Sequence, residues 1–187
     1  MTKLTFITSN EDKIKSVEEV FSNVTNIDLH FVHNDIPEIQ ANSSVEIARE
    51  TALHYARHVN GLVVREDHSL YIRSLYPFPG PYTNFFNKSM PVEILLSMMK
   101  NMSDRTGYFE LAAVLADMNG KTKEFVYRVK INISEYAVGD KGNWDRVLIL
   151  DGEELTFSQK AQKNIITNDC IWHQNYIHIL NYLRSTV

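Results

Sequence analysis

An apolar run that leads into two acids is the feature of this sequence that most restricts its fold. Residues 61–70 are GLVVREDHSL, and the apolar part ends at Glu66-Asp67. Adjacent acids at the tip of a buried strand are costly unless a cation or hydrogen-bond donors compensate them. Ligands bind at strand ends in α/β sheets, so the pair predicts the floor of a site. A solvated pair at an exposed strand end is the structural alternative.

The composition excludes several classes of protein. The 187 residues are 44% hydrophobic, which favours one globular domain over residues 1–187. The net charge of −4 indicates that no nucleic acid polymer is a partner. The sequence has no apolar stretch long enough for a signal peptide or a membrane span, so we expect no membrane association. The single cysteine, Cys170, excludes an internal disulfide and fits a reducing compartment, which predicts a cytoplasmic protein.

Strand and helix patterns alternate in the first half of the chain, and strands dominate later. Strands are predicted at residues 4–8, 27–32, 70–75, 108–117 and 122–133. Helices are predicted at residues 45–59 and 91–99 and after Ser9-Asn10, where an apolar stripe runs from Ile14 to Phe21. Residues 118–121 form a hairpin turn. Ser9 and Asn10 can cap the first helix, Gly61 can end the second, and Asn168 can cap a last helix.

The first strand-to-helix junction is the first place where chemistry gathers. Main-chain N–H groups at a helix start bind anions, and Lys13 adds a positive charge one turn into the helix. The hydroxyls of Thr8 and Ser9 add donors. An ordinary N-cap with a solvated lysine is the structural alternative. The segment is not a Walker A loop, because it has no glycine-rich GK[ST] run.

Three carboxylates form the second place. If Glu46, Glu66 and Asp67 converge, they suit Mg²⁺, which prefers oxygen ligands and also holds waters and substrate phosphates. Glu46 as the capping-box partner of Ser43 is an adequate structural explanation. A third polar segment, residues 156–169, either lines a cleft or caps a helix.

In order along the chain, these motifs resemble the Ham1/ITPA family of inosine triphosphate pyrophosphatases, which hydrolyse non-canonical purine nucleoside triphosphates. They are ITSNEDK, PEIQ, VVREDHSL, PFPGPY, GNWD, and TFSQ followed by KN. The resemblance covers about residues 4–181. It implies an α/β fold in which helices flank a long, curved, mixed β-sheet, with two lobes around a central nucleotide cleft. It also implies a homodimer.

The resemblance implies roles for individual residues. Mg²⁺ would be held by Glu46 and Asp67, with Asp67 also orienting or deprotonating the attacking water. Lys13 would act in catalysis, and Glu66 would support the metal through its waters. Water would attack the α-phosphorus, giving the monophosphate and pyrophosphate. The implied substrate-binding positions are Thr8, Ser9, Asn10, Lys13, Trp144, Asp145, Lys163, Asn168 and Asp169.

The segment that would read the base departs from the family pattern. The family usually has Ser-His-Arg where this chain has Thr167-Asn168-Asp169. An acid accepts hydrogen bonds, whereas Arg only donates, so the preference at the base is reversed. We therefore expect a Mg²⁺-dependent nucleoside triphosphate pyrophosphatase with base specificity altered from ITP and XTP. A non-catalytic nucleotide-binding or regulatory protein on the same fold is the alternative.

Overall fold

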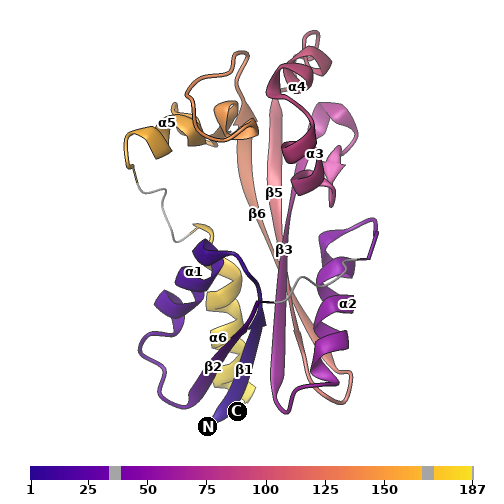
Figure 1. Cartoon of the computed structure of the whole chain (residues 1–187), viewed down its shortest axis with the longest axis vertical. Coiled ribbons are helices and arrows are strands. Elements are labelled where there is room, and N and C mark those ends of the chain that lie inside the picture. The colour runs from indigo at the N-terminus through magenta and orange to yellow at the C-terminus, as the bar shows by residue number, and fades with distance from the viewer. Residues whose placement is uncertain (34–38, 166–170, 187) are drawn as a thin grey trace. The chain divides into compact units, whose positions relative to one another are not determined.

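Seven strands form one mixed β-sheet in the computed structural model, which describes residues 1–33, 39–165 and 171–186 (Figure 1). The strands are β1 Thr2–Ile7, β2 Ile27–Val32, β3 Leu62–Ile72, β4 Pro79–Gly80, β5 Thr106–Ala116, β6 Thr122–Ile133 and β7 Leu148–Leu150. Their order is β2-β1-β3-β5-β6-β7, with β4 paired to β3. β1 is parallel to β2 and β3, whereas β3–β4 and β6–β7 are antiparallel. The expected α/β class with a mixed sheet is confirmed.

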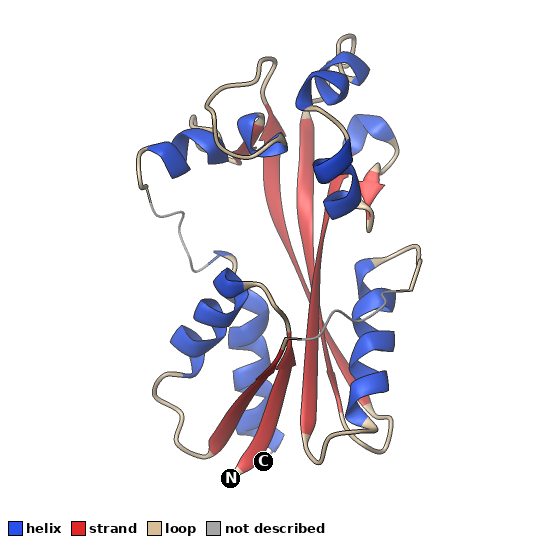
Figure 2. Ribbon diagram, viewed as in Figure 1, coloured by secondary structure: helices blue, strands red, loops and turns tan. Residues whose placement is uncertain are grey.

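Helices lie in most of the connections between strands (Figure 2). The α-helices are α1 Glu11–Phe21, α2 Ser44–Ala56, α3 Thr83–Ser89, α4 Val92–Met98, α5 Phe157–Gln162 and α6 Gln174–Thr186, and the 3₁₀ helices are η1 Arg73–Leu75 and η2 Trp144–Arg146. A turn joins β5 to β6, and α5 and α6 follow β7. Within the described ranges, no helix is both long and apolar enough to cross a lipid bilayer.

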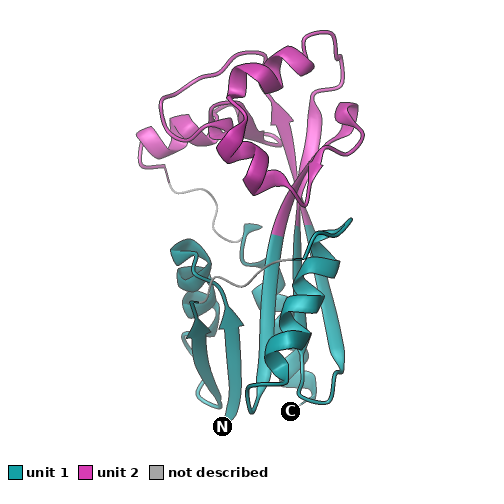
Figure 3. Ribbon diagram, turned by 45° about the vertical axis from the view of Figure 1, so that its right-hand side comes forward, with its two compact units in different colours: residues 1–67, 111–127, 169–187 teal, residues 68–110, 128–168 magenta. Residues whose placement is uncertain are grey.

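The chain divides into two compact units, coloured separately in Figure 3. Unit 1 comprises residues 1–67, 111–127 and 169–187, and unit 2 comprises residues 68–110 and 128–168. β3, β5 and β6 contribute residues to both units. All the residues predicted to hold phosphate or metal belong to unit 1.

Unit 1 buries apolar side chains on both faces of its part of the sheet. On one face, Phe6 and Val64 pack with α1 and α6, while on the other Ile7 and Val63 pack with Ala52 of α2. Successive side chains of a strand point to opposite faces, so even-numbered residues of this part of β3 belong to the α6 side. Odd-numbered residues belong to the α2 side.

The acidic pair lies inside β3 rather than at its tip, which corrects the expected strand end at residue 67. Beyond the acids the strand continues to Ile72, and Leu70 and Tyr71 pair with β4. The separate strand predicted at residues 70–75 is therefore wrong, because its first part completes β3 and its last part is η1. β5 flanks β3 on its other side, so the strand keeps partners beyond the end of β1.

The predicted end of the second helix is also wrong. α2 ends at Ala56 with Arg57 as its C-cap, several residues before Gly61. A Cβ atom on Gly61 would lie 2.8 Å from the carbonyl oxygen of Lys3, so this glycine allows β3 to start close beside β1. The last helix described, α6, begins at Gln174, and the predicted cap Asn168 lies outside the described residues.

Candidate active site

The parallel register of β1 and β3 brings the first strand-to-helix junction beside the acidic pair. Ile7 pairs with Arg65, so Thr8 follows β1 next to Glu66. The guanidinium of Arg65 donates to the carbonyl oxygen of Ile7 over 2.9 Å and fixes this end of β1. The sequence motifs at residues 8–13 and 66–67 are thus neighbours in unit 1.

Asn10 caps α1 and uses its first N–H groups. Its Oδ1 accepts hydrogen bonds from the main-chain nitrogens of Asp12 (2.9 Å) and Lys13 (3.1 Å). The main-chain nitrogen of Asn10 in turn donates to Thr8 Oγ1 over 3.1 Å. The N-cap interpretation is confirmed, and these two N–H groups are already engaged. Ser9 is exposed beside them.

Lys13 is fixed against β3 rather than solvated. Its Nζ donates to the carbonyl oxygen of Glu66 over 3.0 Å and lies 3.7 Å from Oε2 of the same residue. The Lys13 side chain is 18% exposed. A partly buried ammonium held at a defined place is a preorganised partner for a phosphate group.

Glu66 and Asp67 serve different faces of the sheet. The Glu66 carboxylate accepts from Asn175 Nδ2 (3.0 Å) and from the Tyr176 hydroxyl (2.5 Å), both on α6. By strand alternation, Asp67 belongs to the opposite face, which α2 covers. Its side chain is half-buried. Among the described residues the three carboxylates therefore do not converge, because α6 holds Glu66 on the other face. The implied support of the metal by Glu66 through waters stays a prediction.

Glu46 lies in the first turn of α2, on the face to which Asp67 belongs. Its main-chain nitrogen donates to Ser43 Oγ over 3.3 Å, which confirms Ser43 as the N-cap. Its exposed side chain makes no hydrogen bond or ion pair within the described part of the chain. The cap therefore uses the main chain of Glu46 and leaves the carboxylate unengaged.

The carboxylates of Glu46 and Asp67, on the α2 side of the sheet, suit a metal ion that is also coordinated by the substrate. Within the described residues, no group of three or more His, Cys, Asp or Glu side chains could hold a metal by itself. Mg²⁺ is commonly bound by one or two carboxylates together with waters and substrate phosphates. Glu46 and Asp67 fit that pattern as two oxygen ligands that water can reach.

Trp144 is a buried core residue of unit 2. It is 1% exposed, and its indole nitrogen donates to the carbonyl oxygen of Met90 over 3.0 Å. Its neighbour Asn143 donates to the same oxygen over 2.8 Å and to the carbonyl oxygen of Asn87 over 2.6 Å. This arrangement fastens the loop before η2 to the α3–α4 junction. Substrate binding by Trp144 stays a prediction, and its burial favours a supporting role.

Asp145 is the acid of this loop whose environment is most unusual. Burial raises the pKa of Asp145 above its ordinary value of 3.8. A Cβ atom on Gly142 would lie 1.9 Å from Asp145 Oδ2, so only glycine allows this close approach. The guanidinium of Arg146 closes the loop by donating to the carbonyl oxygen of Gly139 over 3.2 Å.

The third polar segment forms a helix cap. Thr156 Oγ1 accepts from the main-chain nitrogen of Gln159 (3.1 Å), and Gln159 Oε1 accepts from that of Thr156 (3.0 Å). Gln159 thus completes the capping box of α5. Lys163 ends α5 with its side chain exposed. Asn168, Asp169 and Cys170 lie outside the described residues, so their predicted roles are not tested.

Three polar residues around the start of α6 were not predicted. Asn175 and Tyr176 bind Glu66. The sequence signal for them is the pair of polar groups in the first turn of a helix that is otherwise apolar on one side. His173 precedes the helix and is 8% exposed, with Nε2 3.7 Å from Glu19 Oε2.

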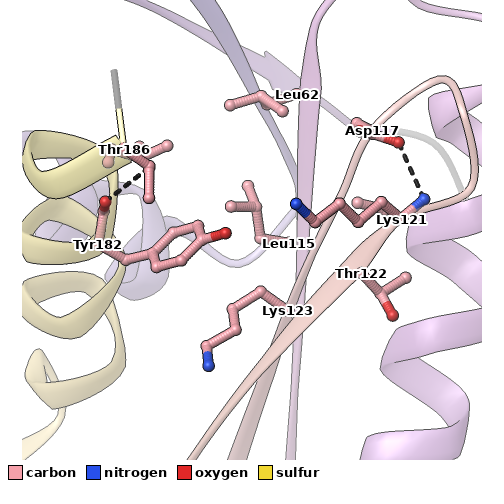
Figure 4. A pocket seen from close by; sticks show the side chains of 10 residues that line it. Leu62, Leu115, Asp117, Lys121, Thr122, Lys123, Tyr182 and Thr186 are labelled. Atoms are coloured by element: carbon pink, nitrogen blue, oxygen red, sulfur yellow. Dashed lines mark hydrogen bonds between the residues drawn. The ribbon is translucent and has the colours of Figure 1, made fainter.

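One pocket of unit 1 involves none of the predicted site residues (Figure 4). Leu62, Leu115 and Leu183 give it an apolar lining, and Lys121 and Lys123 extend beside it. Lys123 Nζ lies 5.8 Å from the ring centroid of Tyr182. Because this pocket shares no residue with the junction of β1 and α1, its residues are suited to control substitutions.

Comparison with known proteins identifies the family. A sequence profile of the Ham1 family matches residues 4–168. A dITP/XTP pyrophosphatase of Saccharolobus solfataricus is 35% identical over 162 residues, covering 85% of this chain and 82% of that protein. An inosine triphosphate pyrophosphatase of Emericella nidulans is 31% identical, covering 90% of this chain and 91% of the relative.

Solved structures agree on the fold. The Ham1 protein of Staphylococcus aureus has a TM-score of 0.77 at 21% identity, and a HAM1 protein of Coxiella burnetii has 0.77 at 17%. Each comparison covers the whole of both chains. The profile match, the identities to curated relatives and the shared fold lead to one conclusion: this chain belongs to the Ham1 family.

Proposed function

We propose that this chain is a Mg²⁺-dependent nucleoside triphosphate pyrophosphatase that releases pyrophosphate and a nucleoside monophosphate. The observation that carries the proposal is the anchored Lys13, which the register of β1 and β3 places beside Glu66-Asp67. The relatives reported above are named as dITP/XTP and inosine triphosphate pyrophosphatases, which supports the same reaction.

Each residue of the site has a chemical task in this proposal. Lys13 stabilises negative charge on the triphosphate, and Thr8, Ser9 and Asn10 shape the junction that receives it. Asp67 orients a water and accepts its proton as the oxygen attacks the α-phosphorus. The bond between that phosphorus and the α–β bridging oxygen breaks, and pyrophosphate leaves. Mg²⁺ bound through Glu46 and Asp67 would offset phosphate charge and polarise the reacting group.

Base recognition is the part in which we propose a departure from ITP and XTP. Asp145 falls on the family's nucleobase-side motif, and a carboxylate at this position can accept hydrogen bonds from a base. Lys163, Asn168 and Asp169 keep their predicted base-side roles. Trp144 supports Asp145 from the core of unit 2.

A substrate panel tests this function. Pyrophosphate release is measured with Mg²⁺ for dITP, XTP, a set of modified-base triphosphates and the canonical triphosphates. We expect turnover that is fastest with a base other than hypoxanthine or xanthine. Fastest turnover of dITP or XTP would contradict the altered specificity alone. Tight binding without turnover of any triphosphate would contradict the enzyme and support the non-catalytic nucleotide-binding alternative.

A further inference from the structure

Glu66 is a buried acid whose two carboxylate oxygens are both bound by neutral donors. The residue is 5% exposed, and its side chain is 3% exposed. Removing a carboxylate from water is costly unless hydrogen bonds replace the lost hydration. Asn175 Nδ2 donates to Oε1 over 3.0 Å, and the Tyr176 hydroxyl donates to Oε2 over 2.5 Å. One turn of α6 thus supplies a donor to each oxygen.

Both donors are held in place by independent contacts. The Tyr176 ring is 2% exposed and packs edge-to-face on Phe6 with centroids 5.8 Å apart. Asn175 is fully buried and also donates to the carbonyl oxygen of Leu111 over 2.9 Å. The packing of the ring and the main chain of β5 therefore set where these donors point, before any ligand binds.

Lys13, on α1, also contacts Glu66, but it binds the main-chain carbonyl of Glu66 rather than the carboxylate. Its Nζ donates to the carbonyl oxygen of Glu66 over 3.0 Å, whereas Oε2 is 3.7 Å away. The second distance is longer than a hydrogen bond, although the opposite charges still attract. The short bond from Tyr176 already occupies this oxygen, so the carboxylate is a weaker competitor for the ammonium.

We propose that Tyr176 and Asn175 are positioning residues that keep Glu66 from capturing Lys13, so that its ammonium stays available for phosphate. The inference rests on the proposed function, which assigns phosphate to Lys13. Without the Tyr176 hydroxyl, Oε2 loses its shortest donor. Lys13 is the cation at 3.7 Å, so its ammonium moves toward the carboxylate and away from the phosphate position.

Binding of inorganic triphosphate to the full chain, measured by calorimetry without nucleoside or metal, tests the proposal. Tyr176→Phe keeps the ring and removes one hydrogen bond to a charged group, so we expect affinity to fall about three- to tenfold. Glu66→Gln in the same chain removes the competing charge and should restore most of the affinity. Tyr182→Phe, on the same helix but lining the pocket of Figure 4, is the matched control.

A merely structural role gives a different pattern. If Tyr176→Phe only loosens the core, its loss of affinity comes from partial unfolding, so the loss disappears at temperatures at which the variant is fully folded. A loss of affinity that disappears in the fully folded variant, a loss that Glu66→Gln does not reverse, or an affinity unchanged by Tyr176→Phe would overturn the proposal while leaving the pyrophosphatase intact. Circular dichroism and thermal unfolding show whether each variant is folded.

The reactivity of Lys13 gives a second readout that needs no ligand. Acylation by an amine-reactive reagent is followed by peptide mass spectrometry, with exposed Lys15 on the same helix as internal reference. We expect Lys13 to react several-fold more slowly in Tyr176→Phe, because the carboxylate then holds the ammonium more closely. An unchanged ratio of Lys13 to Lys15 acylation would overturn the positioning role, whether or not the chain binds triphosphate. Absence of triphosphate binding would contradict the proposed function instead.

Discussion

Lys13 Nζ lies 3.0 Å from the carbonyl oxygen of Glu66, a contact that joins the first turn of α1 to the interior of β3. The two residues are 53 positions apart in the sequence, and the parallel pairing of β1 with β3 brings them together. The anchored cation and the adjacent Asp67 make this junction the centre of the proposed phosphate site.

Replacing Lys13 with alanine should remove most of the activity without unfolding the chain. The ammonium is the positive charge assigned to the triphosphate, and losing such a group lowers kcat/KM by about 10²–10³-fold. Steady-state pyrophosphate release measures the effect. Lys15→Ala, two residues along the same helix and exposed, is the control and should remain within about twofold of the wild type. Equal losses in the two variants would contradict a specific role for Lys13.

Substitution of Glu46 should alter the dependence of activity on Mg²⁺, whereas substitution of Glu50, one turn further along α2, should not. Glu46→Gln removes a proposed Mg²⁺ ligand, so the Mg²⁺ concentration for half-maximal activity should rise by about tenfold or more. Glu50→Gln changes an exposed acid of the same helix and should leave it unchanged. Titration of activity with Mg²⁺ distinguishes them, and full activity after chelation of divalent metals would exclude the metal requirement itself.

The loop before η2 should tolerate no side chain at Gly142. Its φ of +67° is strained for alanine, and the added Cβ would meet Asp145 Oδ2. Gly142→Ala should therefore raise KM for the preferred substrate several-fold by displacing Asp145. Gly120→Ala is the control, because Gly120 also has a positive φ of +84° but has nothing within 4 Å of a new Cβ. It should cost about 1 kcal/mol of stability and leave KM unchanged.

Asp145 should make stability depend on pH in a definite direction. Burial raises its pKa in the folded chain above 3.8, so folding favours the protonated form. The stability that Asp145 contributes is fully present below its unfolded pKa of about 3.9 and is lost as pH rises through the folded pKa. Asp145→Asn removes that loss, so the variant should gain stability relative to wild type between about pH 3 and pH 7.

Urea denaturation of both chains at the two pH values measures this gain. A stability difference between variant and wild type that is the same at both values would show that Asp145 titrates normally.

A homodimer, expected from the family, is testable through the exposed apolar side chains of unit 2. Phe85 is 64% exposed. The same part of the chain, residues 76–98, has four more exposed large apolar side chains: Tyr76, Tyr82, Ile94 and Met98. Such groups favour an interface between copies of the chain. Phe85→Glu should convert a dimer to a monomer in sedimentation velocity, whereas Val126→Glu in unit 1, also exposed, should not. A monomeric wild type would contradict the expectation.

Local sequence signals predict the first strand, the N-cap of α1 and the β5–β6 hairpin. Asn10 caps α1 because its side chain binds N–H groups only two and three residues away. The acidic pair was misplaced at a strand end, because the partners that extend β3 come from β4 and β5 later in the chain. The bonds from Asn175 and Tyr176 to Glu66 span 109 and 110 residues, and only the docking of α6 reveals them.

Hydrolysis in ¹⁸O-labelled water tests the central claim most directly. Attack at the α-phosphorus places one labelled oxygen on the nucleoside monophosphate and leaves the pyrophosphate unlabelled, and Asp67→Asn should lower the rate by about 10³-fold or more. Mass spectrometry of the two products gives the position of the label. Label in the pyrophosphate, release of orthophosphate in its place, or an unchanged rate in Asp67→Asn would contradict the proposed pyrophosphatase.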